Sequence, residues 1–292
     1  MIYKQNTVRI QYLRKLDCFN VIAASGFEER TIKTAQLITE GFELIHPFIR
    51  DDIDIEVCCD DYYSGNDVSL AYCKRNSEDN IMCVPDFIFV NWRQTGVYNY
   101  DETAREIYEA SKIPYEYDKL FWIGALSHPT RKTLCELGES DSRIEAVSMD
   151  WIRQRGRDVT PGDATIYVSL KDHTKYKYLI DLQGHGYSGR VKMLMFSGRP
   201  LFLADRELKE YWYDGIKPFE HYIPVREDLS DLIERLDWAE KNEKEAFQIA
   251  DNARKFACEN LMHNNAVSVM GEILLAVSEE ADILVRGRKS FG

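Results

Sequence analysis

Short runs of apolar residues recur along the chain, and most of them are rich in β-branched or aromatic side chains. Runs of this length and composition are typical of strands that are buried inside a sheet. Because segments of helical period lie between the runs, we expect βαβ units, parallel sheets and a doubly wound α/β fold. The predicted strands are Asn20–Ala24, Ile53–Cys58, Phe87–Trp92, Leu120–Ile123, Ile144–Val147, Tyr178–Leu182, Leu201–Leu203 and Tyr222–Val225.

Helical periodicity is clearest in the last quarter of the chain. Apolar positions in Leu229–Leu236 follow Asp228, which we expect to cap a helix, and a second apolar stripe runs through Ala246–Leu261. A third helical pattern extends over about Val267–Leu284.

The length of 292 residues exceeds the size at which one hydrophobic core usually stays undivided, so we expect two domains. The polar stretch Lys112–Lys119, which contains Pro114, is the best candidate for the junction. The chain then divides into residues 1–115, residues 116–262 and a C-terminal helical segment of residues 263–292.

The formal net charge of −12 and the pI of about 5.1 argue against a protein that binds nucleic acid. A local basic pocket for one small anion is still compatible with that net charge. The first sixteen residues contain no long apolar run, and the seven cysteines form no C-x-x-C pair. We therefore expect a cytoplasmic protein with reduced cysteines, without a transmembrane segment and without a zinc site.

Residues 179–190, LIDLQGHGYSGR, lead from a predicted strand into glycine-rich sequence and then into a predicted helix over Val191–Phe196. Glycines let backbone amides approach a ligand closely, and a helix N-terminus favours an anion. Arg190 adds a permanent positive charge and Ser188 a hydroxyl donor. The segment lacks the lysine of a P-loop and the spacing of G-x-G-x-x-G. On these residues alone, a phosphate site and a simple tight turn remain equally open.

Residues 176–262 resemble glycosyltransferase family 90, which includes protein O-glucosyltransferases and O-xylosyltransferases. The resemblance combines a G-x-x-x-S-x-R element with K-P-[WF]-x-H-Y-[IV]-P-V and D-L-S-D-L elements in the same order. Upstream, FWIGALSHPTR at residues 121–131 and the stretch from Pro85 to Arg93 are similar to further segments of that family. Residues 1 to about 80 show no such similarity.

The resemblance implies a GT-B-like fold, in which two Rossmann-like domains face each other across a cleft. Residues 1–115 would form the acceptor side and residues 116–262 the nucleotide-sugar side, while residues 263–292 would pack back on the N-terminal domain. The implied reaction is inverting transfer of a sugar, glucose or xylose, from a UDP-sugar to a hydroxyl of a surface glycan, without a cofactor or a required metal. The absence of an early G-x-G-x-x-G argues against a nucleotide-sugar epimerase or dehydrogenase.

The resemblance also assigns roles to individual residues. Ser188 and Arg190 would bind the diphosphate of the donor, and Arg131 with Ser127 would border the same pocket, although a solvated residue in the first turn of a helix is the alternative for Arg131. His185 could donate a hydrogen bond to the diphosphate. The residues expected to border the donor are Gly124, Ser127, Arg131, Gly184, His185, Gly186, Tyr187, Ser188 and Arg190.

Inverting transfer needs a base that takes the proton of the acceptor hydroxyl, and a carboxylate is the usual choice. In the protein O-glucosyltransferases an aspartate follows an N-x-R triplet, but here the triplet Asn91–Arg93 is followed by Gln94. A glutamine cannot act as that base. The candidates are Asp60 and Asp61, which end a predicted strand, and Asp101; the first two could also be a plain polar strand end. The alternative function is a non-catalytic subunit that binds a glycan or a UDP-sugar.

Overall fold

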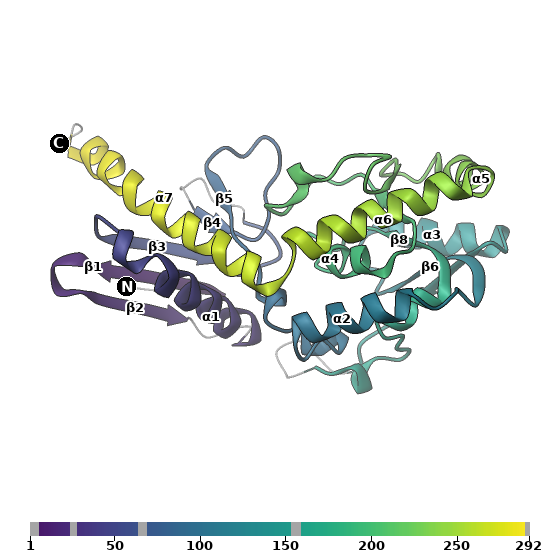
Figure 1. Cartoon of the computed structure of the whole chain (residues 1–292), viewed down its shortest axis with the longest axis horizontal. Helices are drawn as coiled ribbons and strands as arrows, with labels where there is room; N and C mark the ends of the chain where they lie inside the picture. Colours follow the sequence, from purple (N-terminus) through teal and green to yellow (C-terminus); the bar gives the residue numbers. More distant parts are fainter. Residues whose placement is uncertain (1–5, 24–27, 64–68, 153–158, 290–292) are drawn as a thin grey trace. The chain divides into compact units, whose positions relative to one another are not determined.

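The computed structural model describes residues 6–23, 28–63, 69–152 and 159–289 (Figure 1). The chain forms two compact units. Unit 1 comprises Met1–Val90 together with His263–Gly292, and unit 2 comprises Asn91–Met262. This division differs from the junction expected near residue 115. The reason is that helix α2, Tyr100–Ser111, packs within unit 2, where the ring of Tyr100 meets the ring of Phe196 edge-on at 6.5 Å.

Unit 1 contains a five-stranded sheet in the order β2-β1-β3-β4-β5. Strand β1 pairs antiparallel with both β2 and β3, whereas β3, β4 and β5 are parallel to one another. The expectation of parallel sheets is therefore wrong for the first half of this sheet. The strands are β1 (Thr7–Leu13), β2 (Cys18–Ala23), β3 (Ile53–Cys58), β4 (Ser69–Ala71) and β5 (Ile81–Cys83).

Strand β1 was not expected from the sequence, because charged residues alternate with single apolar ones there. The alternation is itself the pattern of a strand with one buried face. Val8, Ile10 and Tyr12 are buried, while Arg9 lies on the other face and forms an ion pair of 2.7 Å with Asp54 of β3.

Two long helices, α1 (Glu28–Ile45) and α7 (His263–Lys289), pack against each other in unit 1. The two helices come close together at Gly41 and Gly271. A Cβ atom built on Gly41 would lie 2.9 Å from the backbone nitrogen of Gly271, and one built on Gly271 would lie 3.0 Å from the carbonyl oxygen of Gly41. The two glycines therefore let the helix backbones touch at this point.

The apolar run at Phe87–Trp92 is not a strand. Residues Phe87–Phe89 form a 3-10 helix, η3, and the Asp86 side chain caps it by accepting a hydrogen bond from the Ile88 amide at 3.2 Å. Aspartate at this position competes with an extended conformation, because its side chain satisfies the backbone donors of a turn. The apolar side chains are buried nevertheless, so hydrophobicity alone could not distinguish the two conformations.

Unit 2 contains a five-stranded sheet in the order β10-β9-β8-β6-β7, and every pair in it is parallel. This confirms the α/β class and the βαβ reading of the second half of the chain. The strands are β6 (Tyr117–Gly124), β7 (Ile144–Ser148), β8 (Tyr176–Asp181), β9 (Leu201–Ala204) and β10 (Ile223–Val225). The α-helices, with α2, are α3 (Pro129–Ser140), α4 (Val191–Leu194), α5 (Leu232–Lys241) and α6 (Glu243–Asn260).

Single 3-10 turns join many of these elements. Besides η3 they are η1 (Arg14–Leu16), η2 (His46–Phe48), η4 (Arg93–Thr95), η5 (Pro161–Asp163), η6 (Asp172–Lys175), η7 (Met195–Ser197) and η8 (Tyr213–Gly215).

The N-cap residue of helix α5 differs from the predicted one. Asp228 was expected to occupy the N-cap position, but Asp231 occupies it, because the helix begins three residues later than expected.

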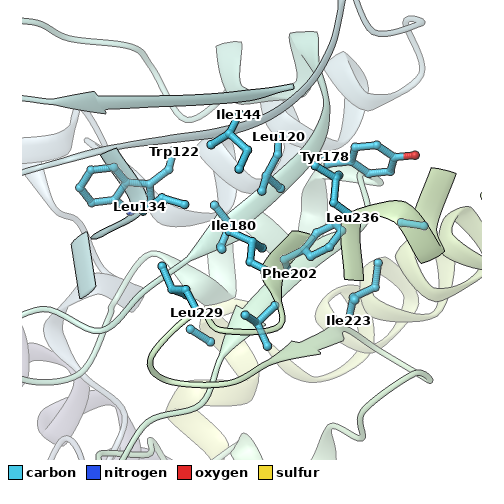
Figure 2. Close-up of a cluster of buried hydrophobic side chains, with 14 of the residues drawn as sticks. Leu120, Trp122, Leu134, Ile144, Tyr178, Ile180, Phe202, Ile223, Leu229 and Leu236 are labelled. Atoms are coloured by element: carbon cyan, nitrogen blue, oxygen red, sulfur yellow. The ribbon is translucent and has the colours of Figure 1, made fainter. Parts of the chain in front are cut away.

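One buried cluster holds unit 2 together, and Figure 2 shows its members converging from the sheet and from the helices beside it. Leu120 and Trp122 come from β6, and Ile180 comes from β8, while Leu134 of α3 and Leu236 of α5 pack on them. The strands of this sheet thus read as continuous apolar runs because their side chains meet apolar neighbours on the sheet faces.

Within the parts of the chain that the structure describes, none of the helices combines the length and the apolar character that crossing a membrane requires.

We predict that Gly271→Ala lowers the free energy of unfolding of unit 1. Alanine favours a helix by about 1 kcal/mol over glycine, but its methyl group would meet the Gly41 carbonyl, and overpacking of this kind costs about 1–3 kcal/mol. Urea unfolding followed by circular dichroism measures the balance. Gly162→Ala is the control, because its Cβ would meet only the Thr160 hydroxyl at 3.8 Å. An unchanged or higher stability of Gly271→Ala would show that the helices separate without cost.

Candidate functional site

The candidate site lies where the order of strands in unit 2 reverses. From β6 the chain goes first to β7, which lies at one edge of the sheet. It then returns to β8, on the other side of β6, and continues through β9 to β10 at the opposite edge. The strand order therefore reverses between the neighbouring strands β6 and β8. At such a point the loops that follow the two strands separate, which leaves room for a ligand at the carboxyl ends of the strands. The predicted donor-binding residues come from these two loops and the helices after them.

Arg131, in the first turn of α3, connects the two loops. Its Nε donates to the carbonyl oxygen of Gln183 at 2.9 Å, and its Nη2 donates to that of Leu182 at 3.2 Å. Its Nη1 donates to the Ala125 carbonyl at 2.9 Å and to the Ser127 hydroxyl at 3.1 Å. The sequence left open whether Arg131 is a solvated helix residue, and the structure answers that it is held by the backbone of both loops.

Asp181 ends β8 and is completely buried. One of its carboxylate oxygens, Oδ1, accepts hydrogen bonds from the Ser188 hydroxyl at 2.9 Å and from the Nε and Nη2 of Arg190 at 3.3 and 3.2 Å. The other oxygen, Oδ2, accepts from Nη1 of Arg206 at 2.9 Å. The structure therefore brings the predicted residues Ser188 and Arg190 together, because both donate hydrogen bonds to the buried carboxylate of Asp181.

An aromatic ring lies beside two of these arginines. The guanidinium carbon of Arg131 is 5.5 Å from the centre of the Trp122 ring, and that of Arg190 is 5.9 Å from it. Nη1 of Arg190 also donates to the main-chain carbonyl of Ile123. A tryptophan face attracts a cation, so the ring helps to hold two like charges near each other.

The charges of the cluster do not balance. Asp181 is one carboxylate, and three guanidinium groups, those of Arg131, Arg190 and Arg206, act on it. Burial would raise the pKa of Asp181, but the Arg206 and Arg190 charges outweigh burial and lower it, so this group is ionised at neutral pH. Two positive charges are therefore in excess, and a bound anion is the natural partner for them.

Arg131 carries most of this imbalance. Among the residues that the structure describes, its hydrogen bonds go to main-chain carbonyls and to one hydroxyl, and none goes to a carboxylate. Burial, followed by repulsion from Arg190, lowers the pKa of Arg131 to about 10, so the group still carries its charge at neutral pH. His173 nearby adds no charge, because burial and the Arg190 charge lower its pKa to about 4.

Two glycines of the predicted site serve close packing and not an unusual backbone conformation. A Cβ atom on Gly184 would lie 3.1 Å from Nη2 of Arg131, and one on Gly124 would lie 2.8 Å from the Trp122 ring. The glycines of described position with positive φ are Gly96 and Gly198, which lie outside the glycine-rich segment. Glycine in this segment therefore leaves room for the arginine and the indole.

The remaining predicted residues of the loop differ in exposure. His185 is exposed, Tyr187 is half-buried and Gly186 is buried. The ring of Tyr187 lies 5.6 Å from Nζ of Lys192, which forms a buried ion pair of 2.6 Å with Glu210. The side chain of His185 is thus more accessible to a ligand than that of Tyr187.

The expected helix over Val191–Phe196 is shorter than predicted. Only Val191–Leu194 are α-helical, and the 3-10 turn η7 follows directly. A single turn of helix has little macrodipole, because the dipole is the sum over aligned peptide units. The positive charge that the structure places at the site therefore comes from the arginine side chains, and the contribution of a helix N-terminus stays a prediction.

Sequence reasoning missed Asp181 and Arg206. Asp181 was included in the predicted strand Tyr178–Leu182, and Arg206, which follows the predicted strand Leu201–Leu203, was given no role. The sequence contained one signal for these two residues, namely their position relative to the predicted strands. Both residues stand at or just beyond the carboxyl ends of adjacent parallel strands, where side chains converge.

The candidate bases are distributed over both units. Asp60 and Asp61 follow β3 in unit 1, as expected for a strand end, while Asp101 lies in the first turn of α2 in unit 2. Oδ1 of Asp60 accepts a hydrogen bond of 2.5 Å from the Asn6 side chain, whereas Asp61 forms an ion pair of 2.8 Å with Arg30.

Gln94 occupies the position at which the family resemblance leads us to expect an aspartate. Gln94 is half-buried in η4, one residue after Arg93, in unit 2.

In the described ranges 6–23, 28–63, 69–152 and 159–289, no three His, Cys, Asp or Glu side chains form a group able to hold a metal ion.

Fold and site together define an α/β protein with an excess of positive charge at the switch point of a parallel sheet. The model of the family "Glycosyl transferase family 90" matches residues 65–288, so this chain belongs to glycosyltransferase family 90. The matched range includes the whole arginine cluster, and it begins after Asp60 and Asp61.

Curated relatives of this chain are named as protein O-glucosyltransferases. Protein O-glucosyltransferase 2 of Danio rerio is 32% identical over 146 residues, which is 50% of this chain and 29% of that protein. Protein O-glucosyltransferase 1 of Rattus norvegicus is 28% identical over 204 residues, which is 68% of this chain and 52% of that protein. This chain therefore spans about half or less of the length of these relatives.

Among solved structures, the Anabaena protein HepE in complex with UDP-glucose matches 82% of this chain and 53% of its own chain. The sequence identity is 9% and the TM-score is 0.37, so this likeness carries no further conclusion.

We predict that inorganic pyrophosphate raises the melting temperature of the protein by several degrees, because a ligand that binds only the folded state stabilises it. The effect should fall in Arg131→Gln and at high salt, since the attraction is electrostatic. Arg143→Gln is the control, because Arg143 contacts the carboxylates of Asp141, Asp237 and Glu240 outside the cluster. Differential scanning fluorimetry measures the shift. A full pyrophosphate shift in Arg131→Gln would contradict the assignment of the anion site.

Proposed function

We propose that this chain transfers a sugar, with inversion, from a UDP-sugar bound at the arginine cluster to an acceptor hydroxyl. The observation that carries the proposal is the uncompensated positive charge at the switch point of unit 2, in a chain that belongs to glycosyltransferase family 90. A UDP leaving group carries two phosphates, so its developing negative charge matches this excess.

The proposal gives each arginine a role that its contacts allow. A guanidinium has five N–H groups, and the contacts of Arg190 with Asp181 and Ile123 use three of them. The others can donate to phosphate oxygens, as can the remaining N–H of Arg131. The loops hold both groups in place before the ligand arrives, which is the condition for strong electrostatic stabilisation of a transition state. In this proposal two arginines replace the divalent cation that other transferases use, and no cofactor takes part.

For the base, the contacts favour Asp60 over Asp61. The carboxylate of Asp61 is held in an ion pair, which directs one of its oxygens at the protein. Its partner is Arg30, whereas Asp60 accepts from the neutral amide of Asn6. Asp101 remains the third candidate.

The relatives support glucose as the transferred sugar, because their names describe O-glucosyltransferases. Xylose remains the second choice from the family resemblance. The same names describe transfer to protein, so the acceptor panel for this chain should contain protein hydroxyls beside the glycan hydroxyls that we proposed from the sequence. A cytoplasmic location is part of the proposal, and it rests on the cysteine pattern of the sequence, which indicates neither a C-x-x-C pair nor a disulfide framework.

The alternative is a non-catalytic subunit that binds a UDP-sugar or a glycan. Gln94, in the place of the family's aspartate, favours this alternative.

We predict that the protein releases UDP from UDP-glucose when glycan or peptide acceptors are present, and that EDTA leaves the rate unchanged. A coupled assay for UDP, run with UDP-glucose and UDP-xylose, measures turnover. Arg190→Ala should weaken UDP binding by a few kcal/mol, and Arg190→Lys should restore only part of it, because lysine cannot form the same fork. Tight UDP binding without turnover on any acceptor would favour the binding subunit.

We predict that Asp60→Asn lowers turnover by about 10²–10⁴-fold while the affinity for UDP stays nearly intact, because only proton removal is lost. Asp61→Asn should have a smaller effect. The matched variant Asp101→Asn tests the third candidate, and steady-state kinetics with fixed acceptor separates kcat from the KM of the donor. If all three variants keep normal turnover, the base is another residue.

A further inference from the structure

Arg206 is the most completely enclosed arginine of the cluster. Its side chain is 1% exposed, and Asp181 beside it is 0% exposed. Nη1 donates to the Asp181 carboxylate at 2.9 Å, and Nη2 donates to the Asp181 main-chain carbonyl at 2.9 Å. Nε donates to the Ala204 carbonyl at 3.1 Å. All three nitrogens are therefore directed at the protein, and a ligand cannot reach the group directly.

Asp181 limits what Arg190 can do for an anion. The Oδ1 atom of this carboxylate holds two nitrogens of Arg190, so an unneutralised Asp181 would attract that guanidinium away from a bound phosphate. It would also repel the phosphate through the buried interior, where charges are poorly screened. Arg206 contacts the opposite oxygen, Oδ2, and supplies the compensating charge from the side away from Arg190.

We propose that Arg206 is a positioning residue for the donor diphosphate: it neutralises Asp181, and so leaves the charges of Arg190 and Arg131 available to the ligand. This inference rests on the proposed function of the same site. Asp181 then serves to orient Arg190 and Ser188 without cancelling the positive potential. The burial of Arg206 shows that it acts through Asp181.

The pairing of Asp181 with Arg206 can be tested as a unit. Arg206→Met removes the arginine that donates to Oδ2 of Asp181, so one of the two excess positive charges is lost. The double variant Asp181→Asn with Arg206→Met removes one charge of each sign, and the excess returns to its original value. Removing both members of a buried pair is tolerated far better than removing one, so the double variant also protects against loss of the fold.

Calorimetric titration with UDP and with uridine gives the required readout. Arg206→Met should bind UDP about tenfold more weakly than the wild type, while uridine affinity stays unchanged, because uridine carries no charge. The double variant should bind UDP within about threefold of the wild type. Arg206→Lys, which keeps the charge, should do the same. Arg199→Met is the matched control: Arg199 is buried in unit 2 and donates to the carbonyls of Thr174 and Ile113, so its loss should lower the melting temperature without changing UDP affinity.

The inference is overturned if Arg206→Met binds UDP like the wild type, or if it loses UDP and uridine affinity in equal measure, as a general structural defect would cause. It is also overturned if the double variant or Arg206→Lys is tenfold weaker than the wild type. Absence of UDP binding in the wild-type protein is a different result, because it removes the proposed function itself.

Discussion

The buried carboxylate of Asp181 is the constraint on which the site of unit 2 depends. An ionised group that is removed from water must be paired, and each pairing fixes another part of the chain. Here the carboxylate fixes Ser188 and Arg190 in the loop after β8, and Arg206 in the segment after β9. One desolvated charge therefore sets the geometry of two loops, and these loops carry residues of the proposed phosphate site.

Arg131 shows a second way to hold a charge. Main-chain carbonyls and one hydroxyl surround its guanidinium, so dipoles keep it in place while its charge remains uncompensated among the described residues. Arg190 is held by a full negative charge and Arg131 by partial ones. The two arginines thus reach a similar rigidity by different means, and the potential that they create at the switch point is not cancelled by the groups that position them.

The sequence located the glycine-rich loop, all five strands of unit 2 and, through the family resemblance, two arginines, Arg131 and Arg190, which the structure brings close to one ring. Three features escaped it for physical reasons. Strand β1 mixes charged and apolar residues because only one of its faces is buried, and Phe87–Phe89 are as apolar as a strand but are capped into a turn by Asp86. Arg206 is ordinary in its local sequence, since its role arises only when the ends of β8 and β9 are brought together. Patterns along the chain predict elements well, whereas a pair of charges that meets across two strands depends on the sheet order.

Unit 1 is built from two separate parts of the chain, and this affects the order in which the units can fold during synthesis. Helix α7 follows unit 2 in the chain, yet it packs on α1 at the contact between Gly41 and Gly271. During synthesis the whole of unit 2 leaves the ribosome before α7 does, so unit 2 can complete its fold first, while the apolar face of α1 still lacks its partner. The sheet of unit 1 therefore lacks the packing of α7 on α1 until that helix emerges, so unit 1, although its first part precedes unit 2 in the sequence, can be completed only after unit 2 has been synthesised.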